Sequence, residues 1–168
     1  MDKNISFQDL LTKLSEIEAS SFKLRPIKTI LEDTECFEIF SVILSQEPPI
    51  VHVVDLKRIS GGFITLRDLL GLFIPKHVDI HSAFSRSQML SNSRAGDLAK
   101  THLPYVYDDT KLKEIAELML KFETDFLPRS ISKKESELQG IILQRDLISE
   151  CREIRLKFNV VRNGENNG

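Results

Sequence analysis

The fold of this chain is decided by a stretch that occurs twice, as GFITLRDLL at residues 62–70 and as GIILQRDLI at residues 140–148. In each copy a glycine and a short apolar run precede an Arg-Asp pair and two more apolar residues. A short apolar run after a glycine is typical of a buried strand, and Arg-Asp followed by apolar residues is typical of the first turn of a helix. Because the strand-to-helix junction recurs 78 residues later, it predicts a duplicated structural unit.

The residues upstream of each junction repeat as well, at an offset of 76. Ala19 falls on Ala95, and the pair Asp33-Thr34 falls on Asp109-Thr110. The offset grows from 76 to 78 only across residues 131–138, which hold two extra residues. Insertions of this size are tolerated in surface turns, so they leave the duplicated pattern intact.

The first copy predicts the order of elements in both units. A short strand is expected at residues 27–31, a helix that starts at Asp33-Thr34, and a strand at residues 50–54 that is buried on both faces. Residues 55–61 form a polar turn before the junction, so each unit reads strand, helix, strand, strand, helix. The predicted organisation is an N-terminal helix (1–18), a first repeat (19–76), a connection (77–94), a second repeat (95–156) and a C-terminal tail (157–168) that frays.

Composition narrows the function classes. The 168 residues are 41% hydrophobic and 29% charged, with a net charge of −2, which fits a globular domain and gives no electrostatic reason to expect nucleic acid. No apolar run is long enough to cross a membrane, and the N-terminus carries no secretion signal. Cys36 and Cys151 match no metal motif, so free thiols in the cytoplasm are expected. His77, His81 and His102 are read as surface histidines rather than a metal site, and no catalytic constellation is present, so the chain is not expected to be an enzyme.

The duplicated pattern resembles a tandem pair of cystathionine-β-synthase (CBS) domains, also called a Bateman module. The resemblance covers residues 19–156 and rests on Gly62-x-x-Thr65-x-x-Asp68, on its echo in residues 140–146, and on the two Asp-Thr helix starts. It implies an α+β fold of two βαββα repeats, related by a pseudo-twofold axis and packed through their sheets. It also implies two clefts between the repeats, which in many family members bind adenine nucleotides or other adenosyl ligands.

The resemblance also implies which residues bind the ligand. In the family, the aspartate of the repeated stretch accepts hydrogen bonds from the ribose hydroxyls, and the Ser/Thr before it assists. Thr65 and Asp68 match that pair, whereas Asp146 in the second repeat is preceded by Leu143 where a hydroxyl is expected. Arg129-Ser130 also replace an apolar pair of the family, so the more complete site is expected at Thr65 and Asp68. The other candidates are Ile27, Lys28 and Thr29 beside the base, Arg67 and Arg145 near phosphate, and Tyr105 as a stacking ring.

Each candidate has a plainer interpretation. Asp68 and Asp146 are also explained as carboxylates that balance the helix dipole. Arg67 and Arg145 are also explained as solvated or paired to nearby acids, and Tyr105 as packing at the rim of the core.

The leading functional hypothesis is a cytoplasmic regulatory module that senses AMP, ADP, ATP or S-adenosylmethionine and signals to an unknown protein partner. The adenine nucleotide is then a regulatory ligand, and no other cofactor is required. A homodimer is expected, with the apolar stripe of residues 7–17 as additional surface to bury. The alternative is a ligand-free dimerisation or docking module that regulates a transporter or an enzyme.

Overall fold

The computed structural model describes residues 7–72, 92–99, 103–133 and 137–164. The chain forms two compact units that do not coincide with the sequence repeats. Residues 27–103 form one, here called the first-repeat unit. Residues 1–26 join residues 104–168 in the other, here called the second-repeat unit. The sequence repeats and the packed units therefore have different boundaries along the chain.

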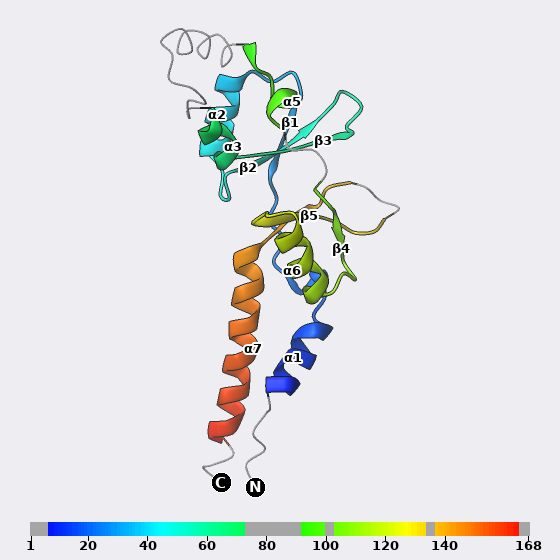
Figure 1. The fold of residues 1–168 in the computed structure, drawn as a ribbon, viewed down its shortest axis with the longest axis vertical. Coiled ribbons are helices and arrows are strands. Elements are labelled where there is room, and N and C mark those ends of the chain that lie inside the picture. Colours follow the sequence, from blue (N-terminus) through cyan, green and yellow to red (C-terminus); the bar gives the residue numbers. More distant parts are fainter. Residues whose placement is uncertain (1–6, 73–91, 100–102, 134–136, 165–168) are drawn as a thin grey trace. The chain divides into compact units, whose positions relative to one another are not determined.

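The first-repeat unit contains one three-stranded sheet (Figure 1). Its strand order is β1-β2-β3, with β1 parallel to β2 and β2 antiparallel to β3. The predicted order of strand, helix, strand, strand and helix is confirmed. The elements are β1 (Lys28–Leu31), α2 (Cys36–Leu44), β2 (Ile50–Val54), β3 (Ser60–Thr65), α3 (Leu66–Gly71) and the short helix α5 (Ala95–Leu98). Strand β3 begins at Ser60, inside the stretch that was expected to be a polar turn.

Alternation along the strands explains the core of this unit. In β2, Val51 and Val53 pack with Ile64 of β3 and with Ile39 and Ile43 of α2. Successive strand residues point to opposite faces, so these valines face the helices. All five residues of β2 are buried, as the continuous β-branched run predicts.

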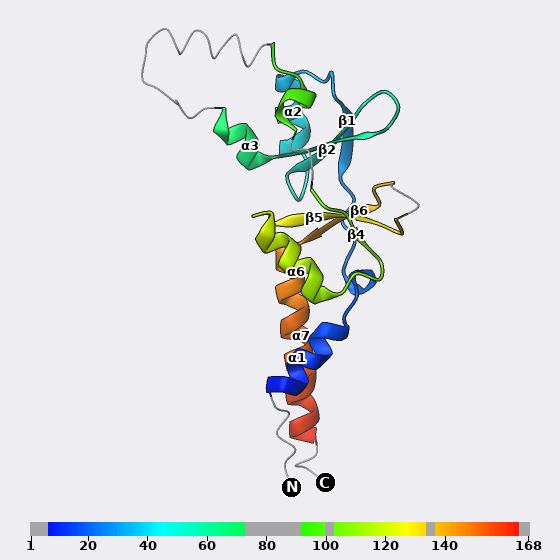
Figure 2. The same ribbon diagram turned by 45° about the vertical axis from the view of Figure 1, so that its right-hand side comes forward.

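The second-repeat unit repeats this arrangement with a sheet of order β4-β5-β6 (Figure 2). Strand β4 is parallel to β5, and β5 is antiparallel to β6. Its core cluster includes Val106, Ile115, Leu127 and Ile142. The elements are α1 (Phe7–Glu16), the 3-10 helix η1 (Ala19–Ser21), β4 (Val106–Tyr107), α6 (Leu112–Lys121), β5 (Phe126–Ser130), β6 (Gly140–Leu143) and α7 (Gln144–Gly164).

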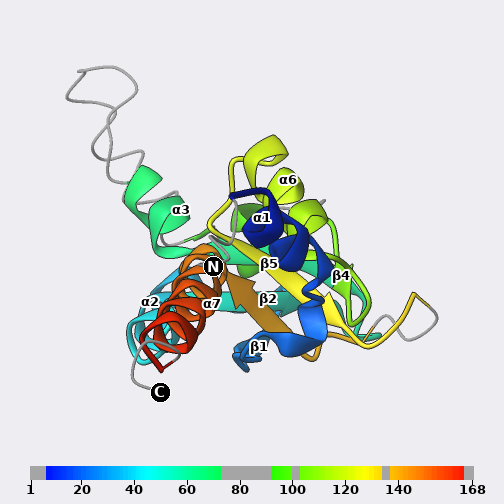
Figure 3. The same cartoon turned by 90° about the horizontal axis from the view of Figure 1, so that it is seen from below.

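Of the two terminal helices of this unit, α7 is longer than expected and α1 is as expected. The tail that was expected to fray after Lys157 continues α7 as far as Gly164. The helix has no proline and no glycine before Gly164, and asparagine alone is only a weak helix breaker, so it is not interrupted. The predicted N-terminal helix is confirmed as α1, which lies against α6 (Figure 3).

Each unit is completed by a segment from the start of the other repeat. Ala19 and Phe22, from the start of the first repeat, are buried in the core of the second-repeat unit. Ala95, from the start of the second repeat, is buried in the core of the first-repeat unit. Since each core uses a short piece of the other repeat, neither contiguous repeat contains a complete unit.

Candidate ligand site

The candidate ribose pair of the first repeat forms the start of α3. Thr65 is the N-cap residue, and its backbone N–H and its hydroxyl both donate to Oδ2 of Asp68, at 2.8 and 2.7 Å. The Asp68 N–H in turn donates to the Thr65 hydroxyl at 3.3 Å. This reciprocal arrangement is a capping box, which satisfies two backbone donors at the helix start. The sequence motif therefore places a half-buried carboxylate and a hydroxyl in direct contact.

The register of the sheet places Thr65 and Thr29 on the same face. Thr65 pairs with Ile50 in β2, and Thr29 pairs with His52, two residues further along the same strand. Paired residues and residues two apart share a face of a sheet. Val51 and its neighbours occupy the opposite face, against the helices. Thr29 and Thr65 thus lie on the face that the unit's own helices do not cover, whereas Lys28 pairs with Val51 and lies on the helix-covered face.

His52 is a polar residue of this face that sequence reasoning missed. Its Nε2 lies 2.9 Å from the Ser60 hydroxyl, its Nδ1 lies 3.4 Å from the Thr29 hydroxyl, and its ring stacks on Phe63 at a centroid distance of 5.0 Å. Burial lowers the pKa of His52 to about 4, so the ring is neutral at pH 7 and has one donor and one acceptor nitrogen. The signal in the sequence was a single histidine inside an otherwise apolar strand.

The remaining candidates of the first-repeat unit lie at the start of β1 and in the first turn of α3. The Lys28 side chain bends toward the end of α2, with Nζ donating to the Ser45 hydroxyl at 3.2 Å, and its backbone N–H donates to Gln46 Oε1 at 2.7 Å. Ile27 is half-buried just before β1, and Arg67 is exposed in the first turn of α3. Six of the nine predicted residues are therefore in one unit, around one sheet.

In the second-repeat unit, Asp146 has a different set of partners. The Leu143 N–H donates to its Oδ2 at 3.1 Å, as the Thr65 N–H does to Asp68. Leu143 has no hydroxyl, and Arg25 instead donates from Nε to Oδ2 at 3.0 Å and from Nη2 to Oδ1 at 2.6 Å. The Asp146 side chain is only 11% exposed. Burial favours the protonated carboxyl, but the hydrogen bonds and charge of Arg25 outweigh it and lower the pKa of Asp146.

The other positions equivalent to the first site are also changed. The offset of 76 places Thr29 on Tyr105 and His52 on Pro128. Tyr105 is half-buried just before β4, and Arg145 is exposed in the first turn of α7. A phenol, a proline and a leucine thus replace the two hydroxyls and the imidazole of the first-repeat unit, so the two repeats present different chemistry.

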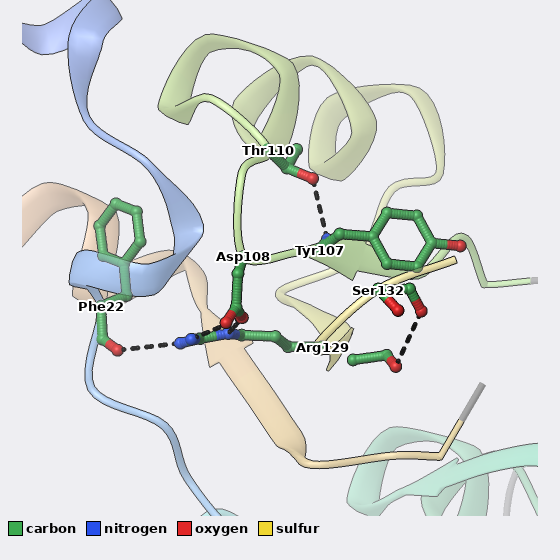
Figure 4. A network of polar contacts seen from close by, with 7 residues as sticks. Phe22, Tyr107, Asp108, Thr110, Arg129 and Ser132 are labelled. Atoms are coloured by element: carbon green, nitrogen blue, oxygen red, sulfur yellow. Dashed lines mark hydrogen bonds and ion pairs between the residues drawn. The ribbon is translucent and has the colours of Figure 1, made fainter. Parts of the chain in front are cut away.

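Arg129 occupies the position of Val53, and its partners are polar groups of the same unit. Its Nε donates to Asp108 Oδ1 at 2.8 Å, and its Nη1 donates to the backbone carbonyl of Phe22 at 3.4 Å (Figure 4). The guanidinium therefore ties the start of the first repeat to β5. In the same network the Thr110 hydroxyl accepts from the Tyr107 N–H at 2.8 Å, which fixes the turn before α6.

The remaining expectations concern the histidines, a metal site and a membrane span. His77, His81 and His102 lie outside the described residues. Among the residues that are described, no group of three His, Cys, Asp or Glu side chains is placed to hold a metal ion. No helix in that part is long and apolar enough to span a membrane.

Known proteins share this fold. Residues 95–153 match the sequence model of the CBS domain. No curated protein sequence matches the chain significantly. Crystal structures with a similar fold include CBSX2 in complex with AMP, at a TM-score of 0.62 and 18% identity, which covers 82% of this chain and 98% of the CBSX2 chain. The CBS domain of a CBS-domain-containing membrane protein from Sphaerobacter thermophilus matches at a TM-score of 0.64 and 16% identity. The match covers 84% of this chain and 92% of that chain.

A third similar structure is the cytosolic domain of the Mg2+ channel MgtE in complex with ATP, at a TM-score of 0.57 and 22% identity. It covers 84% of this chain and 51% of the MgtE chain. At these identities the likeness concerns the fold. The matches, together with the two equivalent sheets, are consistent with a tandem CBS pair and confirm the predicted fold class of two repeats.

Proposed function

We propose that this protein is a non-catalytic, cytoplasmic regulatory module that binds an adenine nucleotide or another adenosyl compound through the first repeat. The observation that carries the proposal is the shared sheet face of Thr29, His52 and Thr65, with the Asp68 carboxylate at the end of β3. A carboxylate accepts hydrogen bonds from two vicinal hydroxyls, which is the pattern a ribose presents. CBS-domain structures of the same fold in complex with AMP and ATP support a nucleotide as the ligand class.

Asp146 supports the choice of the first repeat. Its carboxylate already accepts two hydrogen bonds from Arg25 in a partly buried ion pair. A ribose at this position would have to displace a bidentate guanidinium, and charge-assisted bonds of this kind are the stronger ones. The Asp68 carboxylate is bound by the N–H and the hydroxyl of Thr65, which belongs to the same helix cap.

Signalling would follow from differential binding. A ligand shifts a conformational equilibrium only by the difference in its affinity for the two states. A nucleotide bound at the start of α3 would therefore favour the arrangement in which Thr29, Thr65 and Asp68 contact it together. A protein partner would then recognise this arrangement.

Isothermal titration calorimetry with AMP, ADP, ATP and S-adenosylmethionine tests the proposal. Saturable binding of at least one of them is expected, with adenosine as a control that separates ribose recognition from phosphate recognition. Absence of heat with all four at about 1 mM, a concentration that detects even weak binding, would contradict the proposal.

One observation favours the alternative of a docking or dimerisation module. Leu11 and Leu14 of α1 line an apolar groove of about 580 Å³ with Leu112, Ala116 and Leu120 of α6. Leu120 is 75% exposed, so this surface is available to a second copy or a partner. We therefore expect homodimers at about 100 μM, since mass action favours association at high concentration. Light scattering measures this, and a strictly monomeric mass would exclude the dimer.

A further inference from the structure

The two repeats exchange short docking segments that bind through the same backbone pattern. In the first docking segment, residues 17–22, the Ala19 N–H donates to the Thr110 carbonyl at 2.8 Å. In the second docking segment, residues 93–98, the Ala95 N–H donates to the Thr34 carbonyl at 2.9 Å. Both alanines are fully buried. Neither the backbone bonds nor the alanines distinguish one docking position from the other.

The ion pairs at these positions do distinguish them. Glu18 lies opposite Lys111 in an antiparallel bridge, with Nζ and Oε1 2.8 Å apart. Arg94 lies opposite Glu35 in the equivalent bridge, with Nη1 and Oε1 also 2.8 Å apart. Residues directly opposite in an antiparallel pair have adjacent side chains. The first docking segment thus carries an acidic residue and its unit a basic one, whereas the second docking segment carries a basic residue and its unit an acidic one.

We infer that this reversed polarity specifies which docking segment binds which unit. If each segment bound its own repeat instead, Glu18 would face Glu35 and Arg94 would face Lys111. Like charges directly opposite one another are destabilising. The chain allows this alternative, because the nine Cα-to-Cα steps from Ala19 to Lys28 can span about 30 Å. The four charged residues are therefore specificity determinants for an intramolecular interaction.

Each ion pair contributes little free energy by itself, but the two pairs together favour one arrangement of the segments. Exposed ion pairs contribute little singly, and all four side chains are at least 42% exposed. The alternative arrangement, however, loses two attractions and gains two repulsions at once. Together these differences favour the observed arrangement on the order of tenfold.

Two charge-reversal variants separate specificity from stability. The double variant Glu18→Lys/Lys111→Glu keeps both ion pairs but makes both segments basic and both units acidic, so discrimination is lost. The fourfold variant, which adds Glu35→Arg and Arg94→Glu, keeps both pairs and restores opposite polarity. The Lys111→Glu change removes the hydrogen bond from Lys111 Nζ to the Glu16 carbonyl and places an acid at the start of α6, where the helix dipole favours it. Both variants carry this change, so it does not distinguish them.

Side-chain size is a second difference between the segments. Phe22 is buried in one core, and Leu98, its equivalent at an offset of 76, packs against the other. Each variant is therefore also made with Phe22→Leu, which removes this difference in size, and is compared with the chain that carries Phe22→Leu alone, so that the remaining differences between the segments are the same in both.

Amide NMR spectra of the full chain, recorded after refolding from denaturant, provide the readout. The double variant is expected to show a second set of signals from residues 17–22 and 93–98. In the Phe22→Leu background that set should be populated about tenfold more than in the chain carrying Phe22→Leu alone. The fourfold variant should show a single set. A single set in the double variant, or an equal second set in the fourfold variant, would overturn the inference.

Discussion

Asp68 and Asp146 occupy equivalent places in the two repeats and share a backbone partner but not a side-chain partner. In both repeats the N–H three residues earlier donates to Oδ2. Thr65 completes one site with its hydroxyl, and Arg25 completes the other with its guanidinium. One substitution, Thr to Leu at the junction, is thus accompanied by a change from a local cap to a long-range ion pair.

The binding prediction at this scale concerns these two carboxylates. Asp68→Ala should weaken adenine-nucleotide binding about ten- to hundredfold, because a charged acceptor facing the ribose is lost. Asp68→Asn keeps an oxygen for the Thr65 N–H and so controls for loss of the helix cap. Calorimetry with the nucleotide that binds the parent measures the effect, with circular dichroism to show that each variant is folded.

The same experiment includes Asp146→Ala. It should affect binding less than Asp68→Ala but should destabilise the fold more, because Arg25 is left without the carboxylate that it contacts. If Asp146→Ala abolishes binding while Asp68→Ala binds as the parent does, the ligand occupies the other repeat.

His52 makes stability depend on pH. Its pKa in the folded chain is about 4, against 6.5 for a free histidine. Between these values the unfolded chain binds more protons, so the free energy of unfolding falls as the pH drops, by up to about 3 kcal/mol. In His52→Gln, which retains a neutral polar group, this dependence should flatten. Urea denaturation between about pH 7 and pH 4.5 tests it, and equal slopes in both proteins would contradict the assignment to His52.

At the scale of elements, the two glycines of the repeated stretch are needed for different reasons. Gly62 has φ of 122°, a conformation that residues with a Cβ rarely adopt, and it lies beside an irregularity in the pairing of β2 with β3. Gly140 is needed for space, because a Cβ there would lie 2.6 Å from the Arg25 carbonyl oxygen. Arg25 and Ile141 exchange backbone hydrogen bonds at this contact.

We predict that Gly140→Ala destabilises the protein by about 1–3 kcal/mol, since backbone atoms must shift to admit the methyl group. Gly71→Ala is the matched control, because a Cβ at Gly71 meets nothing within 4 Å. Denaturant unfolding of both variants gives the comparison. Equal stability of the two would show that the segment before β1 adjusts without cost.

At the scale of the whole molecule, the exchange of docking segments determines which fragments can fold. Residues 19–76 contain the first repeat but lack Ala95, which is fully buried in its core. Residues 27–103 contain both the sheet and this alanine. The unit of folding is thus offset from the unit of sequence duplication.

The fragment 27–103 should unfold cooperatively, whereas the fragment 19–76 should not, because its core is incomplete. Thermal unfolding followed by circular dichroism distinguishes them. The fragment 27–103 with Ala95→Glu controls for length, and it should resemble 19–76. Cooperative unfolding of 19–76 would show that the second docking segment is dispensable.

Local pattern determined the elements, and tertiary structure determined their partners. The continuous β-branched run of β2, the junction at Thr65 and Asp68 and the recurrence of that junction were sufficient to predict two βαββα repeats, because each pattern is formed by residues close in sequence. The sequence also showed that Leu143 and Arg129 depart from the family pattern, but it did not show which residues they contact.

Only the folded chain assigns Arg25 to Asp146, 121 residues away, and Arg129 to Asp108 and the Phe22 carbonyl. It also places Ala19 and Ala95 in the units of the opposite repeats and turns His52 toward Thr29 and Ser60. These contacts join residues whose proximity depends on strand pairing and on chain exchange. Periodicity along the sequence specifies which face of an element is buried, but it carries no information about the segment that buries it.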